Sequence, residues 1–180
     1  MNKIVAIVGM CGSGKSVVTS VFNEMGWESV YFGGVTMDRL KELGLPRNEA
    51  NERMVREGLR KEHGSAAFAK LLCPTIEEKV KHSNVALDGL YSWSEYKCLK
   101  DKFGDTLTVL AVVTNRNKRY ERLAKREIRP LKPEEAKSRD YSEIENSEKG
   151  GPISIADIYL LNNASVDELR ENTKKIINNL

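Results

Sequence analysis

A glycine-rich segment near the N-terminus has the residue types and the spacing of a phosphate-binding loop. Residues 9–16 read GMCGSGKS, which matches the pattern G-x-x-x-x-G-K-[ST] between an apolar, strand-like run and a helical pattern. The glycines let backbone amides wrap a β-phosphate, Lys15 brings positive charge to the β- and γ-oxygens, and Ser16 offers a hydroxyl to Mg²⁺. A glycine turn before a buried helix is disfavoured, because position, spacing and both terminal residues agree with the motif. The residues predicted to bind the nucleotide are Gly9, Cys11, Gly12, Ser13, Gly14, Lys15, Ser16 and Val17.

Cys11 lies inside this loop, close to the start of the helix that follows it. A helix N-terminus can lower the pKa of a thiol, which would allow redox gating of nucleotide binding. We favour the simpler interpretation that Cys11 fills a variable position of the loop.

Asp88 is the second candidate for chemistry, because it ends a predicted strand at the edge of the sheet where ligands bind. A carboxylate there can hold a Mg²⁺-bound water or orient the acceptor. The alternative is a strand-end aspartate that caps a turn through Gly89. We favour the functional interpretation, with Asp88 as a catalytic residue and, together with Ser16, a metal ligand.

Alternating strand-like and helical patterns predict a doubly wound α/β sheet in one domain, residues 1–180. This is the three-layer P-loop NTPase fold, with a five-stranded, mostly parallel sheet whose apolar runs are buried on both faces. A helical acceptor-binding insertion at 33–82 and a short lid at 127–152 are expected to project beyond the carboxyl ends of the strands. Ser92 and Ser165, each with a glutamate three residues later, predict the starts of two helices. The predicted strands are Lys3–Val8, Ser29–Phe32, Asn84–Asp88, Leu107–Thr114 and Ile158–Leu161.

Composition excludes several classes of protein. With 180 residues, 40% hydrophobic and 31% charged, the chain is an ordinary globular domain, and its net charge of +3 does not predict nucleic-acid binding. Three dispersed cysteines and two histidines disfavour a disulfide framework and a zinc site. No apolar run approaches the roughly 18 to 20 residues of a membrane span, and the opening stretch is too short for a signal peptide. We therefore expect a cytoplasmic protein without a membrane partner, and we leave its oligomeric state open.

Two large classes of phosphate-binding-loop protein do not fit. A GTP switch would carry D-x-x-G after the third strand and N-K-x-D after the fourth. The second of these is represented only by Asn117-Lys118-Arg119-Tyr120, which lacks the acidic residue that reads guanine and lies in a helical pattern. A large AAA or helicase motor is excluded by length. A small phosphotransferase remains.

The motifs of this chain resemble those of small P-loop kinases. Gly9–Ser16, Asp88-Gly89 and the stretch Arg122-Leu123-x-x-Arg126 resemble the adenylate kinase and nucleoside monophosphate kinase family. The tail from Ala156 to Leu169 resembles the end of dephospho-CoA kinase. As a whole, and with its Arg139-Asp140 pair, the chain is most similar to the adenylate kinase-related proteins found widely in archaea. The resemblance covers nearly the full length and implies an ATP- and Mg²⁺-dependent kinase.

Arginines after the fourth strand are the candidates for stabilising the transferring phosphoryl group. Arg122 and Arg126 lie one helical turn apart on one face, and the resemblance implies that they begin the lid and clamp phosphates. Arg129 and Arg139 flank the lid segment, and Arg139 is predicted as the arginine that returns to the site. The alternative for this stretch is a solvated, charged helix.

The acceptor side matches neither family completely. Adenylate kinases carry an Asp and an Arg where this chain has Gly34 and Met37, and a further Arg that is missing after Asp88-Gly89. Dephospho-CoA kinases usually carry an acidic residue directly after the second strand, where this chain has glycines, and Asp38 lies a helical turn away. The candidates for replacing these missing arginines in acceptor binding are Arg39, Arg53, Arg56 and Arg60, for which an exposed basic helix face is the alternative.

The prediction is a kinase that uses ATP and Mg²⁺ to phosphorylate a small, nucleotide-like acceptor. Its predicted catalytic residues are Lys15, Asp88, Arg122, Arg126 and Arg139. Two alternatives stay open. One is dephospho-CoA kinase, which phosphorylates a ribose hydroxyl. The other is an ATP-binding protein that hydrolyses ATP slowly and acts through a partner.

Overall fold

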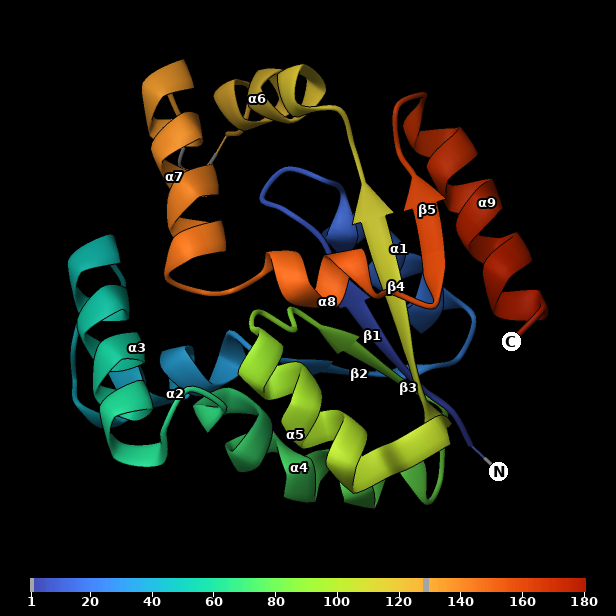
Figure 1. Cartoon of the computed structure of the whole chain (residues 1–180), viewed down its shortest axis with the longest axis horizontal. Coiled ribbons are helices and arrows are strands. Elements are labelled where there is room, and N and C mark those ends of the chain that lie inside the picture. The colour runs from blue at the N-terminus through green and yellow to red at the C-terminus, as the bar shows by residue number, and fades with distance from the viewer. Residues whose placement is uncertain (1, 128–129) are drawn as a thin grey trace.

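Five parallel strands form the centre of the molecule (Figure 1). This computed structural model describes residues 2–127 and 130–180, so Arg129 lies outside the described residues. The strands run in the order β2-β3-β1-β4-β5, and every neighbouring pair is parallel. Their bounds are β1 Ile4–Val8, β2 Glu28–Tyr31, β3 Val85–Asp88, β4 Leu107–Val113 and β5 Ile158–Leu161. The predicted fold is confirmed, and each end of each strand lies within one residue of its predicted position.

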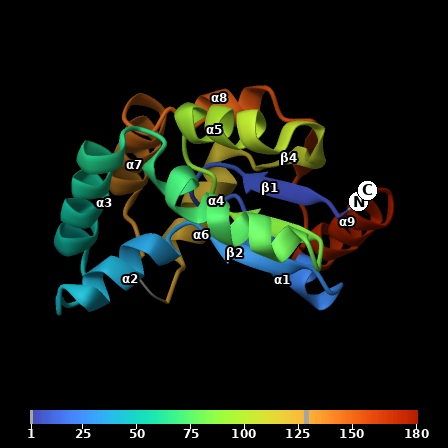
Figure 2. The same cartoon turned by 90° about the horizontal axis from the view of Figure 1, so that it is seen from below.

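Helices cover both faces of the sheet, which explains why the strands read as unbroken apolar runs (Figures 1 and 2). On one face α1 and α9 pack together through Val18, Phe22 and Leu169. On the other face α4 and α5 supply Phe68 and Leu99 to a larger core. The helices are α1 Lys15–Glu24, α2 Gly34–Glu42, α3 Glu49–His63, α4 Ala67–Val80, α5 Trp93–Phe103, α6 Arg116–Ala124, α7 Pro133–Glu145, α8 Gly150–Ser154 and α9 Val166–Asn178, with a short 3-10 turn at Gly104–Thr106.

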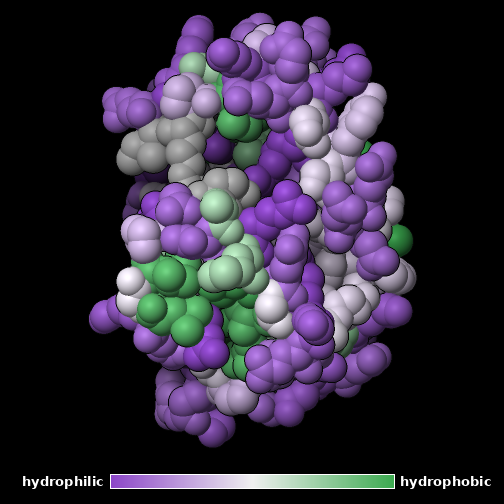
Figure 3. Space-filling model, turned by 90° about the vertical axis from the view of Figure 1, so that its left-hand side faces the viewer, coloured by the Kyte–Doolittle hydropathy of each residue, from purple (hydrophilic) through white to green (hydrophobic). Residues whose placement is uncertain are grey.

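Two arms extend from the carboxyl ends of the strands and face each other (Figures 1 and 2). One arm is α2 with α3, and the other is α6 with α7. The space-filling view onto these arms shows a mostly hydrophilic face that is hollowed above its centre (Figure 3). α4, although it lies within residues 33–82, packs against β2 and β3 as part of the core. The parts of that segment that project are therefore α2 and α3.

The segment 130–152 contains α7 and the start of α8, where the sequence indicated only a polar, charged stretch. α7 begins at Pro133 and buries Ala136, Asp140 and Glu143. Two of these three buried residues are acidic, so the helix has no apolar stripe that a sequence pattern could reveal. Among the described residues, no helix is both long and apolar enough to cross a bilayer.

The predicted start of α5 is confirmed, and it contains a fully buried carboxylate. Ser92 accepts a hydrogen bond from the Glu95 amide, and Glu95 accepts from the amides of Ser92 and Tyr91 through Oε2. The other oxygen, Oε1, is buried without a partner among the described residues. Burial raises the pKa of Glu95 to about 7, although these amides and the charges of Arg60 and Lys149 oppose the shift.

This buried carboxylate is expected to make stability depend on pH. Between the ordinary pKa of 4.5 and the folded value of about 7, the folded chain keeps a proton on Glu95 that the unfolded chain loses. The free energy of unfolding therefore falls as pH rises through this window, by roughly 2–4 kcal/mol, and levels off above it. Urea unfolding at pH 5 and pH 8 measures the loss. Glu95→Gln should lack this component and Glu145→Gln, an exposed control, should retain it; equal pH dependence in all three proteins would contradict the assignment.

Candidate nucleotide-binding site

The loop between β1 and α1 is shaped by close contacts that require glycine. Gly9 has φ 149°, and a Cβ there would lie 2.5 Å from the carbonyl oxygen of Val112 in β4. Gly14 has φ 101°, and a Cβ there would collide with the side-chain amide of Asn162 after β5. α1 begins at Lys15 without a side-chain cap, so the first amides of the helix are left for an anion.

Lys15 lies against its own loop. Its ammonium donates hydrogen bonds to the carbonyl oxygens of Gly9 and Met10, at 2.7 and 3.0 Å. Desolvation, reinforced by the nearby charge of Lys149, lowers the pKa of Lys15 to about 8. Because desolvation disfavours the charged form of Lys15, a phosphate that binds next to its ammonium would stabilise that charge.

Asp88 ends β3 beside this lysine. Burial raises the pKa of Asp88, against the charge of Lys15 and a hydrogen bond with Thr19 of α1. Ser16 is exposed in the first turn of the same helix. No cluster of three or more acidic, histidine or cysteine side chains that could hold a metal exists among the described residues. Ser16 and Asp88 supply a hydroxyl and a carboxylate, which are oxygen ligands of the kind that Mg²⁺ takes when it is bound together with substrate phosphates.

The three arginines predicted to act in catalysis surround the loop but do not converge on one point. Arg122 donates to the backbone and side-chain oxygens of Asn162, at 3.2 and 3.3 Å, while its Nη1 is buried without a partner among the described residues. Arg126 approaches the Cys11 sulfur at 3.9 Å. Arg139 donates to Glu143, at 3.3 Å.

A buried ion pair that the sequence did not predict joins α6 to α7. Arg119 donates two hydrogen bonds to Asp140, at 2.7 and 2.6 Å, and a third to the carbonyl oxygen of Cys11, at 3.0 Å. Tyr120 also donates to Asp140. The available signals were the Arg139-Asp140 pair and the position of Arg119 one turn before Arg122. The ion pair ties the second arm to the phosphate loop.

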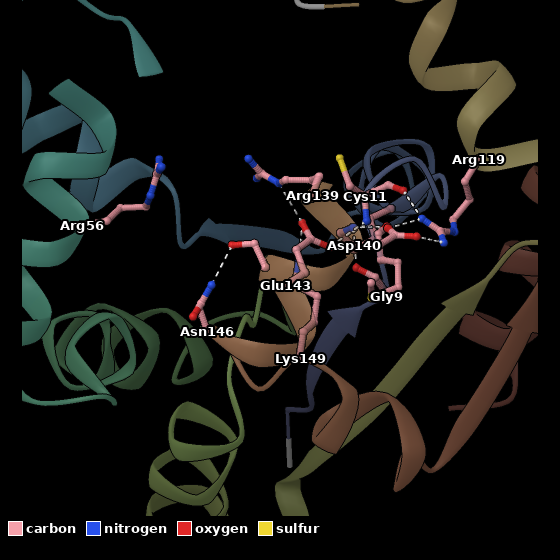
Figure 4. A network of polar contacts seen from close by, with 12 residues as sticks. Gly9, Cys11, Arg56, Arg119, Arg139, Asp140, Glu143, Asn146 and Lys149 are labelled. Atoms are coloured by element: carbon pink, nitrogen blue, oxygen red, sulfur yellow. Dashed lines mark hydrogen bonds and ion pairs between the residues drawn. The ribbon is translucent and has the colours of Figure 1, made fainter. Parts of the chain in front are cut away.

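A second unpredicted group lies directly on the loop (Figure 4). Glu143 accepts a hydrogen bond from the amide of Cys11, at 3.0 Å, and pairs with Lys149, at 2.9 Å. Both side chains are buried. Nothing in the sequence distinguishes this glutamate from the other acidic residues of a highly charged segment.

The four arginines considered for the acceptor side divide into two pairs. Arg39 and Arg53 are exposed and pair with glutamates of their own helices. Arg56 is partly buried next to the buried Glu52, and Arg60 lies over the ring of Phe68, 5.4 Å from its centre. In Figure 4 the side chains of Arg56 and Arg139 lie on opposite sides of one open space. Of these four arginines, Arg56 is the one that Figure 4 places beside this open space.

Comparison with known proteins places this chain in a family. The model of the AAA domain matches residues 5–148. A UPF0200 protein of Thermococcus sibiricus is 31% identical over 181 residues, which cover 98% of this chain and 95% of the relative. The chain is a UPF0200 protein with an AAA domain. A chain of 180 residues is too short for a large AAA motor, but it contains the AAA domain itself.

Solved structures show which fold the UPF0200 protein shares. The dephospho-CoA kinase of Campylobacter jejuni is similar with a TM-score of 0.56 and 18% identity, covering 99% of this chain and 97% of its own. A shikimate kinase of Bacteroides thetaiotaomicron is similar with a TM-score of 0.61 and 12% identity, covering 98% of each chain. The UPF0200 protein therefore has the P-loop kinase-like fold. A specific likeness to adenylate kinase stays a prediction.

Proposed function

We propose that this UPF0200 protein is an ATP- and Mg²⁺-dependent small-molecule kinase, which transfers the γ-phosphoryl group to a nucleotide-like acceptor. The observation that carries the proposal is the arrangement of Lys15 and Asp88 beside the phosphate loop, between two arms that both present arginines. Binding of a nucleoside triphosphate alone requires only Lys15 and Asp88 at the loop, and does not require arginines on both arms. The arm formed by α2 and α3, which carries Arg56 and Arg60, supports an additional, anionic substrate.

On the donor side, Lys15 and the loop amides bind the phosphates of ATP. Ser16 and Asp88 are the residues that would hold Mg²⁺, which when bound neutralises charge on the phosphate oxygens. Arg122, Arg126 and Arg139 close over the transferring group. The Nη1 of Arg122, which is buried with no partner in the part of the chain that the structure describes, would gain a hydrogen-bond acceptor there. Closure of the arms excludes water and thereby suppresses hydrolysis of ATP.

On the acceptor side, Arg56 and Arg60 recognise the anionic part of the substrate. Both lie on α3; the side chain of Arg56 lies beside the open space opposite Arg139, and Arg60 lies over the ring of Phe68. The acceptor is then held between α3 and the carboxyl end of β3, where Asp88 orients the acceptor oxygen. In the transfer, the bond from the γ-phosphorus to the bridging oxygen of ADP breaks as the bond to the acceptor oxygen forms.

The proposal is tested by ADP release from Mg·ATP with a panel of acceptors. The panel contains AMP, CMP, UMP, GMP, dTMP, their deoxy counterparts and dephospho-CoA. Strong stimulation by one nucleoside monophosphate, lost in Lys15→Ala, is the expected result. Stimulation by dephospho-CoA alone would replace the acceptor assignment. Tight ATP binding with no stimulation by any compound would favour an ATPase that acts through a partner.

Arg56→Gln is expected to raise the KM for the acceptor by about tenfold or more, with little change in the KM for ATP. The loss corresponds to one charge-assisted contact with an anion. Arg53→Gln, an exposed change on the same helix, is the matched control and should alter neither constant. Initial rates over both substrate concentrations separate the two constants. An equal rise in both KM values for Arg56→Gln would place this arginine outside the acceptor site.

A further inference from the structure

The carboxylate of Glu143 lies where the phosphate loop presents its amides. Its Oε2 accepts from the backbone N–H of Cys11, at 3.0 Å. Its Oε1 is 2.9 Å from the ammonium of Lys149 and 3.3 Å from Nε of Arg139. The exposed fractions of the two paired side chains are only 7% for Glu143 and 4% for Lys149. Figure 4 shows this group between the loop and the turn that connects α7 to α8.

Glu143 has the chemistry of an internal substitute for a phosphate oxygen. The loop amides are donors aimed at an anion, and a carboxylate and a phosphate are both anions that accept through oxygen. Burial opposes ionisation of Glu143, but Lys149, Lys15 and Arg139 together hold its pKa below the ordinary value. The side chain is therefore charged at neutral pH. One amide N–H of Cys11 cannot serve Glu143 and a nucleotide phosphate equally well.

Lys149 is the second half of this arrangement. Its ammonium lies 5.0 Å from the centre of the Tyr91 ring and close enough to Lys15 to lower the pKa of that lysine. Two buried ammonium groups in one site need an anion between them. Glu143 supplies that anion, and a bound phosphate would supply it equally. When a bound phosphate replaces Glu143, the ammonium of Lys149 therefore still has an anionic partner in the site.

We propose that Glu143 holds the place of a nucleotide phosphate on the loop, and that the arriving phosphate displaces it and takes over Lys149. Lys149 is then a phosphate-binding residue, and Glu143 is the residue that positions it beforehand. The exchange also breaks the direct hydrogen bond between the loop and α7, while Arg119 still joins Asp140 of α7 to the carbonyl oxygen of Cys11. This inference rests on the proposed binding of ATP at the loop.

The test is calorimetric titration of ATP into the full chain and three variants. Glu143→Gln keeps the shape of the side chain but removes its charge, so ATP should bind about tenfold more tightly or better. Lys149→Met should weaken ATP binding by about tenfold. Glu145→Gln, an exposed change two residues from Glu143 on the same helix, should leave the affinity unchanged. A gain of affinity is an effect that a merely structural role of Glu143 would not produce.

The outcomes separate this inference from the proposed function. If the wild-type chain binds ATP and Glu143→Gln binds it with equal or lower affinity, the displacement is wrong while the proposed function stands. If Lys149→Met binds ATP as tightly as the wild type, Lys149 does not receive the phosphate. If neither the wild type nor Glu143→Gln binds ATP, both proposals fail. Glu143→Asp retains the charge, but its shorter side chain reaches the Cys11 amide less well, so this variant is also expected to bind ATP more tightly than the wild type. It replaces Glu143→Gln in the test if the glutamine variant folds poorly.

Discussion

Replacing Lys15 by methionine is expected to reduce the rate of phosphoryl transfer by about 10²–10³-fold, the loss that typically follows removal of one preorganised donor from an active site. The physical reason is that Lys15 is the charged residue of the loop itself, where the carbonyl oxygens of Gly9 and Met10 hold its ammonium, and the proposed function places the phosphates of ATP next to it. Methionine keeps the unbranched stem and its packing but removes the charge. The rate of ADP formation with the best acceptor measures the loss.

The same substitution is expected not to destabilise the fold. Desolvation lowers the pKa of Lys15 to about 8, which means that the folded chain disfavours its charge. Removing that charge leaves the free energy of unfolding at pH 7 unchanged or higher. Lys97→Met, an exposed change on α5, is the control for loss of a lysine. Full activity of Lys15→Met would contradict the site, and inactivity accompanied by unfolding would contradict this account of its electrostatics.

Replacing Arg119 by methionine is expected to destabilise the protein by about 3–5 kcal/mol, because it leaves the buried carboxylate of Asp140 without its partner. The carbonyl oxygen of Cys11 loses its donor at the same time. Urea unfolding at pH 7 measures the change. Arg116→Met, an exposed change on the same helix, should cost little.

A double variant distinguishes the ion pair from simple packing. Arg119→Met with Asp140→Leu removes both charges, and replacement of a buried pair by apolar side chains is often close to neutral. The double variant should therefore recover most of the stability that Arg119→Met loses, although Tyr120 also gives up its acceptor on Asp140. A double variant that is less stable than Arg119→Met would show that the pair itself is not the source of the loss.

Sequence patterns predicted the parts of this fold that follow from local rules. The unbroken apolar runs became parallel strands covered on both faces, and the serine–glutamate pairs at Ser92 and Ser165 begin α5 and α9. The phosphate loop was predicted for the same reason, since its glycines and Lys15 lie within eight consecutive residues. In each case the determining residues are neighbours in the chain.

The parts of the site that the sequence did not predict depend on contacts between segments that are distant in the chain. Glu143 meets the loop amide of a residue 132 positions earlier, and Arg119 meets Asp140 across two helices. α7 buries acidic side chains because basic partners from elsewhere neutralise them, so its sequence resembles a solvated helix. Likewise the partial burial of Arg56 and the position of Arg60 over Phe68 depend on how α3 packs, which distinguishes them from the exposed Arg39 and Arg53.

The most direct test of the proposed kinase activity is to follow the fate of the γ-phosphoryl group by ³¹P NMR. ATP, Mg²⁺ and the acceptor that stimulates ADP release are incubated with the wild-type protein, with Lys15→Met as the blank. The account predicts a new phosphate resonance on the acceptor that grows as the γ-resonance of ATP disappears, with little inorganic phosphate. If the γ-phosphoryl group appears only as inorganic phosphate, at a rate independent of the acceptor, the protein is an ATPase and the assignment of α2 and α3 to acceptor binding is wrong.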